Sequence, residues 1–139
     1  MREKTLFKAI VSMRMPLVLV LLGAASSAAI ADGTPSERLH TRCGWFDNPS
    51  PGNATLTDRD GEWTVAQQGT SSATGRWPRF TTAQWVQTGS GSAGHGCACL
   101  KVRDDAGSAT IVDIVSARAA ALSKCRQDKA LVEPVNPLQ

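Results

Sequence analysis

Four cysteines constrain the fold of this 139-residue chain more than any other feature of its sequence. They are Cys43, Cys97, Cys99 and Cys125, and all of them follow an N-terminal segment typical of export. An even number of cysteines in an exported chain predicts disulfides, here two. Cys97 and Cys99 should lie beside each other along one face of a strand, a geometry that disfavours a bond between them. We therefore expect one to bond to Cys43 and the other to Cys125, and the sequence leaves open which bonds to which.

Residues 1–31 have the composition of an export signal. Four basic residues and a single acid come first, followed by an apolar run over residues 15–25 and by the small residues Ala29 and Ala31 around Ile30. This order predicts a bacterial signal peptide that is cleaved before Asp32. The apolar run is well short of the ~20 residues needed to cross a bilayer, so no membrane anchor should remain after cleavage. We expect a periplasmic or secreted protein.

The basic excess of the chain belongs to this segment. The chain has 15 Lys and Arg against 12 Asp and Glu, and residues 1–31 contain four of the bases and one of the acids. The mature chain of 108 residues therefore keeps 11 of each and has no net charge. A neutral domain gives no electrostatic reason to expect nucleic acid or an anionic membrane as a partner.

The mature chain is long enough for one domain. Short β-prone segments separated by turn residues recur at roughly ten-residue spacing. They are residues 42–46, 54–57, 63–66, 84–88, 97–103 and 110–115. This pattern predicts an all-β fold, a small antiparallel sandwich or barrel, with a short C-terminal helical turn within residues 117–126 and two disulfides. We expect a flexible leader over residues 32–41, a single β domain over 42–133 and a flexible tail over 134–139.

Turn residues and periodicity add local detail. The two prolines and two asparagines of residues 48–53 predict a turn, and Asp60-Gly61 predicts a hairpin turn with positive φ angles. Residues 67–75 are rich in Gly, Ser and Thr and predict a long loop. Within residues 97–103 the apolar side chains alternate, which predicts that Ala98, Leu100 and Val102 face the core.

Four tryptophans are candidates for the core or for ligand contact. Trp45 and Trp63 lie in regular segments, so we expect them in the core. Trp77 and Trp85 lie in or next to an irregular, proline-containing segment and are equally suited to core packing and to a binding surface for sugar rings or a peptide. The acids of the 58–62 hairpin predict a solvated turn near Arg59, in preference to a calcium loop or a catalytic carboxylate pair.

An alternative interpretation uses the cysteines chemically. His95 precedes Cys97 and Cys99, and a Cys-x-Cys pair with a nearby imidazole suits copper(I) or zinc. Thiolates at the same positions would also allow redox chemistry. Structural disulfides are favoured, because the chain has no Met-rich run and its other histidine, His40, falls in the expected leader. Catalytic triads, zinc-protease motifs and phosphate loops are absent from the sequence, so we predict no catalytic residue and no cofactor.

Several sequence strings resemble one bacterial family. They are RCGWFDNP at residues 42–49, LTDRDGEW at 56–63, QWV at 84–86, GHGCAC at 94–99 and CR at 125–126. Together they resemble the family catalogued as domain of unknown function 4087, whose members are small exported proteins that contain cysteines. The resemblance covers about residues 42–133. It implies a shared fold and shared cysteines, and it implies no activity.

These observations favour an exported binding module without catalytic activity. Its partner is unknown, and the aromatic residues suit cell-wall glycan, a peptide or another exported protein. The alternative is a periplasmic metal-binding or thiol-redox protein built on the segment from Cys97 to Cys99.

Overall fold

The computed structural model describes residues 38–135. The expected signal peptide, most of the expected leader and residues 136–139 lie outside this range. The strands are β1 (His40–Ser50), β2 (Asn53–Asp58), β3 (Gly61–Gln67), β4 (Ser71–Ser72), β5 (Thr74–Gly75), β6 (Trp85–Gln87), β7 (Gly94–Asp105) and β8 (Thr110–Ala120). A single turn of 3-10 helix, η1 (Thr82–Gln84), precedes β6, and one short helix, α1 (Leu122–Gln127), follows β8. No helix of the described residues is both long and apolar enough to span a membrane.

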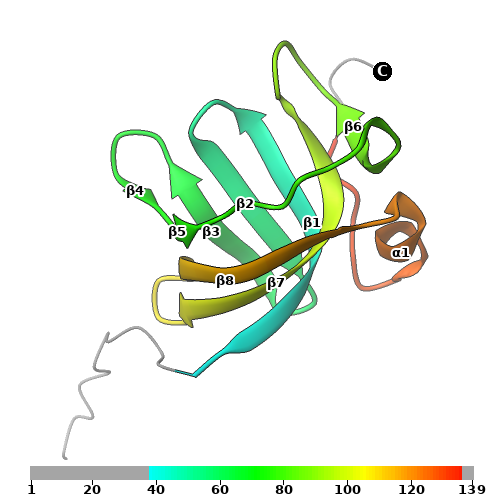
Figure 1. Ribbon diagram of the computed structural model, residues 1–139. Coiled ribbons are helices and arrows are strands. Elements are labelled where there is room, and N and C mark those ends of the chain that lie inside the picture. The colour runs from blue at the N-terminus through cyan, green and yellow to red at the C-terminus, as the bar shows by residue number, and fades with distance from the viewer. Residues whose placement is uncertain (1–37, 136–139) are drawn as a thin grey trace, which may run out of the picture. The chain divides into compact units, whose positions relative to one another are not determined.

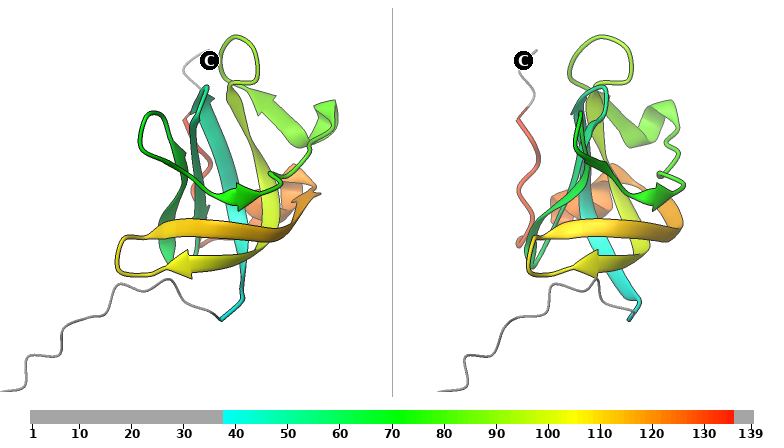
Figure 2. Two further views of the ribbon diagram at one scale, coloured as in Figure 1. Left: turned by 60° about the vertical axis from the view of Figure 1, so that its left-hand side comes forward. Right: turned by 90° about the vertical axis from the view of Figure 1, so that its left-hand side faces the viewer.

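The strands form one sheet that closes into a ring. Their order is β4-β3-β2-β1-β7-β8-β5, with β6 added to β7, and a pairing of Thr64 with Thr110 joins β3 back to β8 (Figure 1). β8 and the end of β7 run across the direction of β1, β2 and β3, as the turned views show (Figure 2). Two register shifts in the β7–β8 pairing are bulges that allow these strands to bend, which closes a small ring. The predicted all-β fold with a short helix and two disulfides is confirmed.

Alternation along β1 and β7 separates two apolar clusters. The inner faces of the ring enclose the main core, in which Leu56, Leu100, Val102 and Ile111 are at most 1% exposed. Ala98 and Leu100 face this core as the period of two predicts. A second cluster lies on the outer face and consists of Trp45, Cys97 and Cys125, with side chains of α1 and the C-terminal segment packed against them. The burial predicted for Trp45 and Trp63 is confirmed, at 0% and 6% exposure.

β1 is longer than the sequence predicts. It starts at His40 and continues through Asn48 and Pro49, where we had expected a turn. Asn48 pairs with Gly94 of β7, and a register shift against β2 between Asp47 and Ser50 accommodates Pro49, which has no N–H to donate. The turn is confined to Pro51 and Gly52, the latter with φ of 76°.

Three other local predictions need correction. The hairpin turn after β2 lies at Arg59 and Asp60, and only Gly61 has a positive φ there. Residues 67–75 are not one long loop, because β4 pairs with β3 and β5 pairs in parallel with β8. The expected helical turn begins at Leu122, since β8 stays paired with β7 as far as Ala120.

Candidate functional site

The two disulfides occupy neighbouring positions on the outer face of β7. Cys43 bonds to Cys99, its direct partner across the β1–β7 pairing, and Cys97 bonds to Cys125 of α1. The expectation that Cys97 and Cys99 bond outward is confirmed, and the structure settles which bonds to which. All four cysteines are bonded, so none is a free thiol.

The disulfide pairing bears directly on the metal-binding and redox alternative. Cys97 and Cys99 belong to different disulfides, so a thiolate pair beside His95 would require the reduction of both. Within residues 38–135 no group of three His, Cys, Asp or Glu side chains is placed to hold a metal ion. Within these residues the oxidised form therefore presents neither the thiolate ligands nor the free thiol that this alternative requires.

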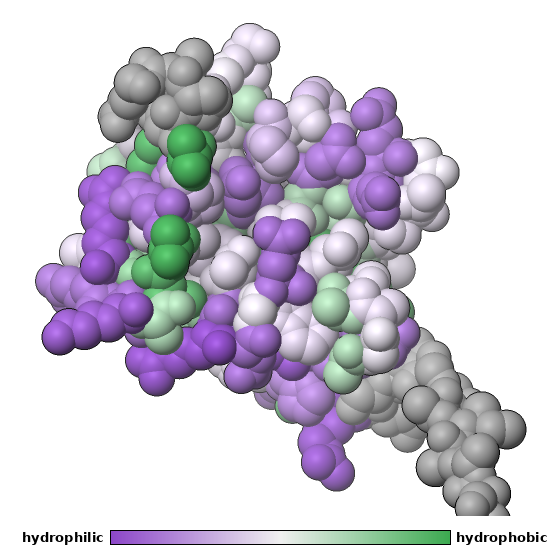
Figure 3. Space-filling view, turned by 180° about the vertical axis from the view of Figure 1, so that it is seen from behind, coloured by the Kyte–Doolittle hydropathy of each residue, from purple (hydrophilic) through white to green (hydrophobic). Residues whose placement is uncertain are grey.

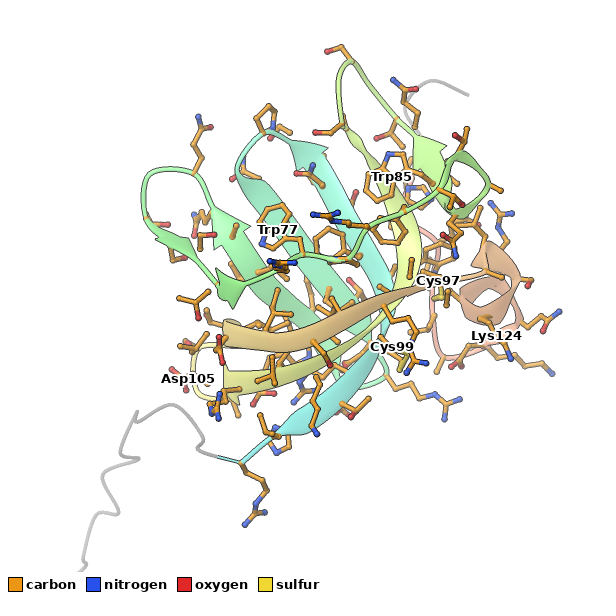
Figure 4. The ribbon with its side chains drawn as sticks, in the orientation of Figure 1. Trp77, Trp85, Cys97, Cys99, Asp105 and Lys124 are labelled. Carbon is orange, nitrogen blue, oxygen red and sulfur yellow. A yellow bond between two sulfur atoms is a disulfide. The ribbon has the colours of Figure 1, made fainter. Side chains whose placement is uncertain are left out.

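An aromatic cluster lies at the side of the ring that the segment between β5 and β6 covers. Phe46 of β1 contacts Trp77 at 5.6 Å and Phe80 at 6.0 Å between ring centroids, and Phe80 contacts Trp85 at 4.8 Å. Trp77, Phe80 and Trp85 pack against the main core and stay partly exposed. Trp77 and Trp85 lie along the same side of the molecule, and Cys97 and Cys99 lie nearer α1 (Figure 4). The structure thus joins both sequence-predicted tryptophans in one continuous aromatic surface.

Two glycines of β7 make room for this cluster. A Cβ atom on Gly96 would lie 2.5 Å from Cε1 of Phe80, and one on Gly94 would collide with the indole of Trp85. Both glycines are buried, and their strand positions pair with Trp85 and Gln87 of β6. The Gly-His-Gly string of residues 94–96 is therefore the part of β7 that accommodates the rings.

The cluster forms one wall of a hollow of about 600 Å³. Its lining residues include no charged side chain. They combine the four aromatic residues and Pro78 with the polar or small residues Asn48, Thr81, Thr82, Gln87, Gly91 and Ser92. The molecule's rear face is instead largely hydrophilic, with its hydrophobic atoms in small separate patches (Figure 3). A neutral, amphipathic ligand fits the hollow chemically.

His95 lies on the opposite face of β7 from the aromatic rings that Gly94 and Gly96 accommodate. Its ring is 1% exposed, meets Trp45 edge-on at 5.3 Å, and has Nε2 3.1 Å from Oε1 of Glu133. Arg126 donates two hydrogen bonds of 2.8 Å to the same carboxylate. These hydrogen bonds from Arg126, with a further contribution from His95, lower the pKa of Glu133 to about 2. The contacts fix the C-terminal segment against the sheet.

Replacing Glu133 with glutamine should therefore make the free energy of unfolding depend less on pH between 4.5 and about 2. The folded pKa of about 2 lies below the ordinary value of 4.5, so the carboxylate stabilises the fold above pH 4.5 and loses this contribution as the pH falls through 2. We expect Glu133→Gln to cost less than about 1 kcal/mol at pH 6, because the pair is partly exposed, and to cost progressively less towards pH 2. Urea unfolding at several pH values measures the difference. Glu62→Gln, an exposed acid, is the control, and a pH-independent cost of Glu133→Gln would contradict the expectation.

A charged network that the sequence did not reveal fills the end of the ring near the β2–β3 turn. Arg42, 8% exposed, donates from Nε to Asp104 at 2.6 Å and from Nη1 to Asp58 at 2.9 Å and Asp60 at 3.1 Å. Its guanidinium lies 3.5 Å from the ring centroid of Trp63. Burial opposes the charge of Arg42, but its hydrogen bonds to Asp104 and Asp58 outweigh this and raise its pKa. With each buried carboxylate bound to a base, the network is suited to holding strands together.

A comparison with family models places these features in a known group. The model described as "Protein of unknown function (DUF4087)" matches residues 37–132. The chain belongs to this family. No curated protein and no solved structure matches the chain. The match spans all eight strands and both disulfides of the DUF4087 domain. Disulfides persist in oxidising surroundings, so this domain's two bridges indicate a compartment outside the cytoplasm.

Sequence reasoning found part of the DUF4087 domain's aromatic surface. It predicted Trp77 and Trp85 as candidates and missed Phe46, Phe80 and the two seating glycines. Gly94 and Gly96 alternate directly before residues 97–103, whose side chains have a period of two. This alternation was an available signal, because glycines on one face of a strand mark a face that another group approaches closely. The network around Arg42 had no comparable signal, since its acids are distant in sequence.

Proposed function

We propose that this protein is an exported, non-catalytic binding module that holds neutral glycan units of the cell envelope in its aromatic hollow. The observation that carries the proposal is the lining of that hollow, which pairs aromatic rings with uncharged polar side chains. Export follows from the signal predicted in residues 1–31 and agrees with the two disulfides. An exported protein would encounter such a glycan in the periplasm or in the medium.

The chemistry of a sugar matches this lining. A pyranose ring presents a face of C–H groups that packs on an aromatic ring, and its hydroxyl groups need donors and acceptors around that face. Phe80 and Trp85 supply adjacent rings, 4.8 Å apart between centroids. Thr81, Thr82 and Gln87 lie among the lining residues with hydroxyl and amide groups, and all three are exposed. A charged ligand would find no counter-ion there, because the lining residues carry none.

The tryptophans provide a direct test. Trp45 and Trp63 are buried, so changes of fluorescence on ligand addition would come mainly from Trp77 and Trp85. Titration with soluble N-acetylglucosamine oligomers and with maltohexaose should quench or shift the emission in a saturable way. Trp85→Ala should weaken binding at least tenfold, which corresponds to about 1.4 kcal/mol. Thr82→Ala changes only an exposed rim residue and should weaken it by a smaller factor.

The controls separate loss of binding from loss of folding. Thr41→Ala alters an exposed threonine of β1 that does not line the hollow, and it should bind as the wild type does. Circular dichroism melts check that Trp85→Ala and Thr82→Ala stay folded. The proposal is wrong if neither glycan series changes the fluorescence or heat of the folded wild type, or if Trp85→Ala and Thr82→Ala both leave the affinity unchanged.

A further inference from the structure

β8 has a stretch of edge that no other strand covers in the described part of the chain. On one side it pairs with β7 as far as Ala120. On the other side β5 pairs only with Asp113 and Ile114, and the chain then turns away at Gly75, whose φ is 92°. Residues 115–120 therefore present the backbone N–H and C=O groups of one edge without a strand partner (Figure 1).

This free edge forms one side of a groove of about 770 Å³. Six consecutive residues of β8, 114–119, line it, and the opposite side comes from the segment after β5 through Arg76, Trp77, Arg79 and Gln84. Six residues of strand extend over roughly 20 Å, so the groove matches the length of a short extended peptide. Such a peptide could add as a strand, with backbone hydrogen bonds to β8.

Most side chains of the edge leave its backbone accessible. Soluble proteins usually protect free edges with charged side chains, prolines or a covering segment. Here Ser116, Ala117 and Ala119 are small, Val115 keeps 49% of its surface exposed, and Arg118 is the one charged residue of the stretch. A bulge at the β7–β8 register shift between Ile114 and Ser116 separates this stretch from the part of β8 that β5 covers. The accessible stretch is thus continuous and ends at Ala120, just before α1.

The charges of the groove select the partner. Arg76, Arg79 and Arg118 are exposed and line the groove, and no acidic residue is among its lining residues. Within residues 38–135 these three arginines form no ion pair or side-chain hydrogen bond, whereas Arg42, Arg59, Arg103 and Arg126 each pair with a carboxylate. Three guanidinium groups along one short groove attract carboxylates.

We infer that the groove between β8 and residues 76–84 binds an extended acidic peptide segment of another protein by strand addition. The backbone edge supplies affinity, and the arginines supply selectivity for carboxylate side chains on the incoming strand. This site is separate from the aromatic hollow, although Trp77 lines both. The inference therefore does not depend on the proposed glycan binding.

The experiment uses a fluorescein-labelled hexapeptide of alternating glutamate and valine, with binding followed by fluorescence anisotropy. We expect saturable binding that weakens as salt increases, and at least tenfold weaker binding to Arg118→Glu and to the double variant Arg76→Glu/Arg79→Glu. Lys129→Glu makes the same kind of charge change at an exposed residue outside the groove and should bind normally. Thr41→Ala, an exposed residue outside both the groove and the hollow, should also leave peptide binding unchanged. Thermal melts confirm that each variant is folded.

Three further probes separate strand addition from charge attraction: an N-methylated peptide, a basic peptide and polygalacturonate. The same hexapeptide with N-methyl groups at alternate positions keeps its charge and loses backbone donors, so it should bind at least tenfold more weakly. A lysine-valine hexapeptide should not bind. Equal binding of the N-methylated peptide, or stronger binding of polygalacturonate than of the acidic peptide, would overturn the inference and assign the groove to an acidic polymer held by charge. Absence of peptide binding to the folded wild type would overturn it outright.

Discussion

Replacing both Cys43 and Cys99 with alanine should lower the free energy of unfolding by about 4 kcal/mol, and replacing both Cys97 and Cys125 by about 3.5 kcal/mol. The bonds join residues 56 and 28 positions apart, so each restricts a long loop of the unfolded chain. A domain of this size typically has a net stability of only about 5–15 kcal/mol, and the two contributions together fall within this range. Full reduction should therefore unfold the protein or bring it close to unfolding.

The two bonds can be compared cleanly because their surroundings differ. Cys43 is exposed, so Cys43→Ala removes little packing, whereas Cys97 and Cys125 are 3% exposed and pack against Trp45. Reduction leaves the sulfur atoms in place and isolates the cross-link from this loss of packing. Guanidinium unfolding of the wild type with and without reductant, and of both double variants, measures each part. A wild-type melting temperature that reductant leaves unchanged would contradict the expectation.

The sequence predicted those parts of the fold that local chemistry determines. Alternation along residues 97–103 placed Ala98, Leu100 and Val102 inside and both cysteines outside, and the structure agrees. The choice of partner for each cysteine depends on the register of β1 against β7, where Cys43 lies opposite Cys99. Register between strands more than 50 residues apart leaves no local trace. The alternation could therefore predict outward bonding and could not decide the pairing.

The sequence predicted a sandwich or a barrel, and it could not decide between them for the same reason. Ring closure depends on one pairing, Thr64 with Thr110, and on β5, a strand of two residues inside a segment whose composition predicts a loop. So short a strand has no periodicity to detect. The free edge of β8 and the groove beside it follow from this closure, so no local pattern in the sequence marks Arg76, Arg79 and Arg118 as residues of one groove.

The acids of the β2–β3 hairpin show how proximity in sequence misleads. Asp58 and Asp60 flank Arg59, and a solvated turn around that residue was the expectation. In the structure Asp58 is 8% exposed and pairs with Arg42, while Arg59 extends away and pairs with Asp128 at 2.9 Å. Hydrogen bonding to Arg59 lowers the pKa of Asp128. The pairing of Arg42 follows from the β1–β2 and β1–β7 registers, which bring it beside acids from two other strands.

Replacing Arg42 with methionine should lower the free energy of unfolding by about 3–5 kcal/mol, the range expected when one partner of a buried ion pair is removed. Asp104 is fully buried and Asp58 is 8% exposed, and the variant would remove the guanidinium that binds both. Asp104 would keep only the His40 imidazole, 3.0 Å away, and Asp58 the indole N–H of Trp63 among its side-chain partners. Methionine keeps much of the length of the arginine side chain and can still pack on Trp63. The loss should therefore report the charge and its hydrogen bonds more than a cavity. Denaturant unfolding at neutral pH measures it.

Three companion variants identify the cause of that loss. Asp60 is bound to the same Arg42 Nη1 atom, but its side chain is 73% exposed, so Asp60→Asn should change stability by less than about 1 kcal/mol. Adding Asp104→Asn to Arg42→Met should recover part of the lost stability, because it removes a buried charge that has lost its guanidinium partner. Arg42→Lys should fall between wild type and methionine, since an ammonium group cannot reproduce the planar fork that reaches Asp104 and Asp58 together. If Arg42→Met cost no more than Asp60→Asn, the network would contribute nothing to holding β1, β2 and β7 in register.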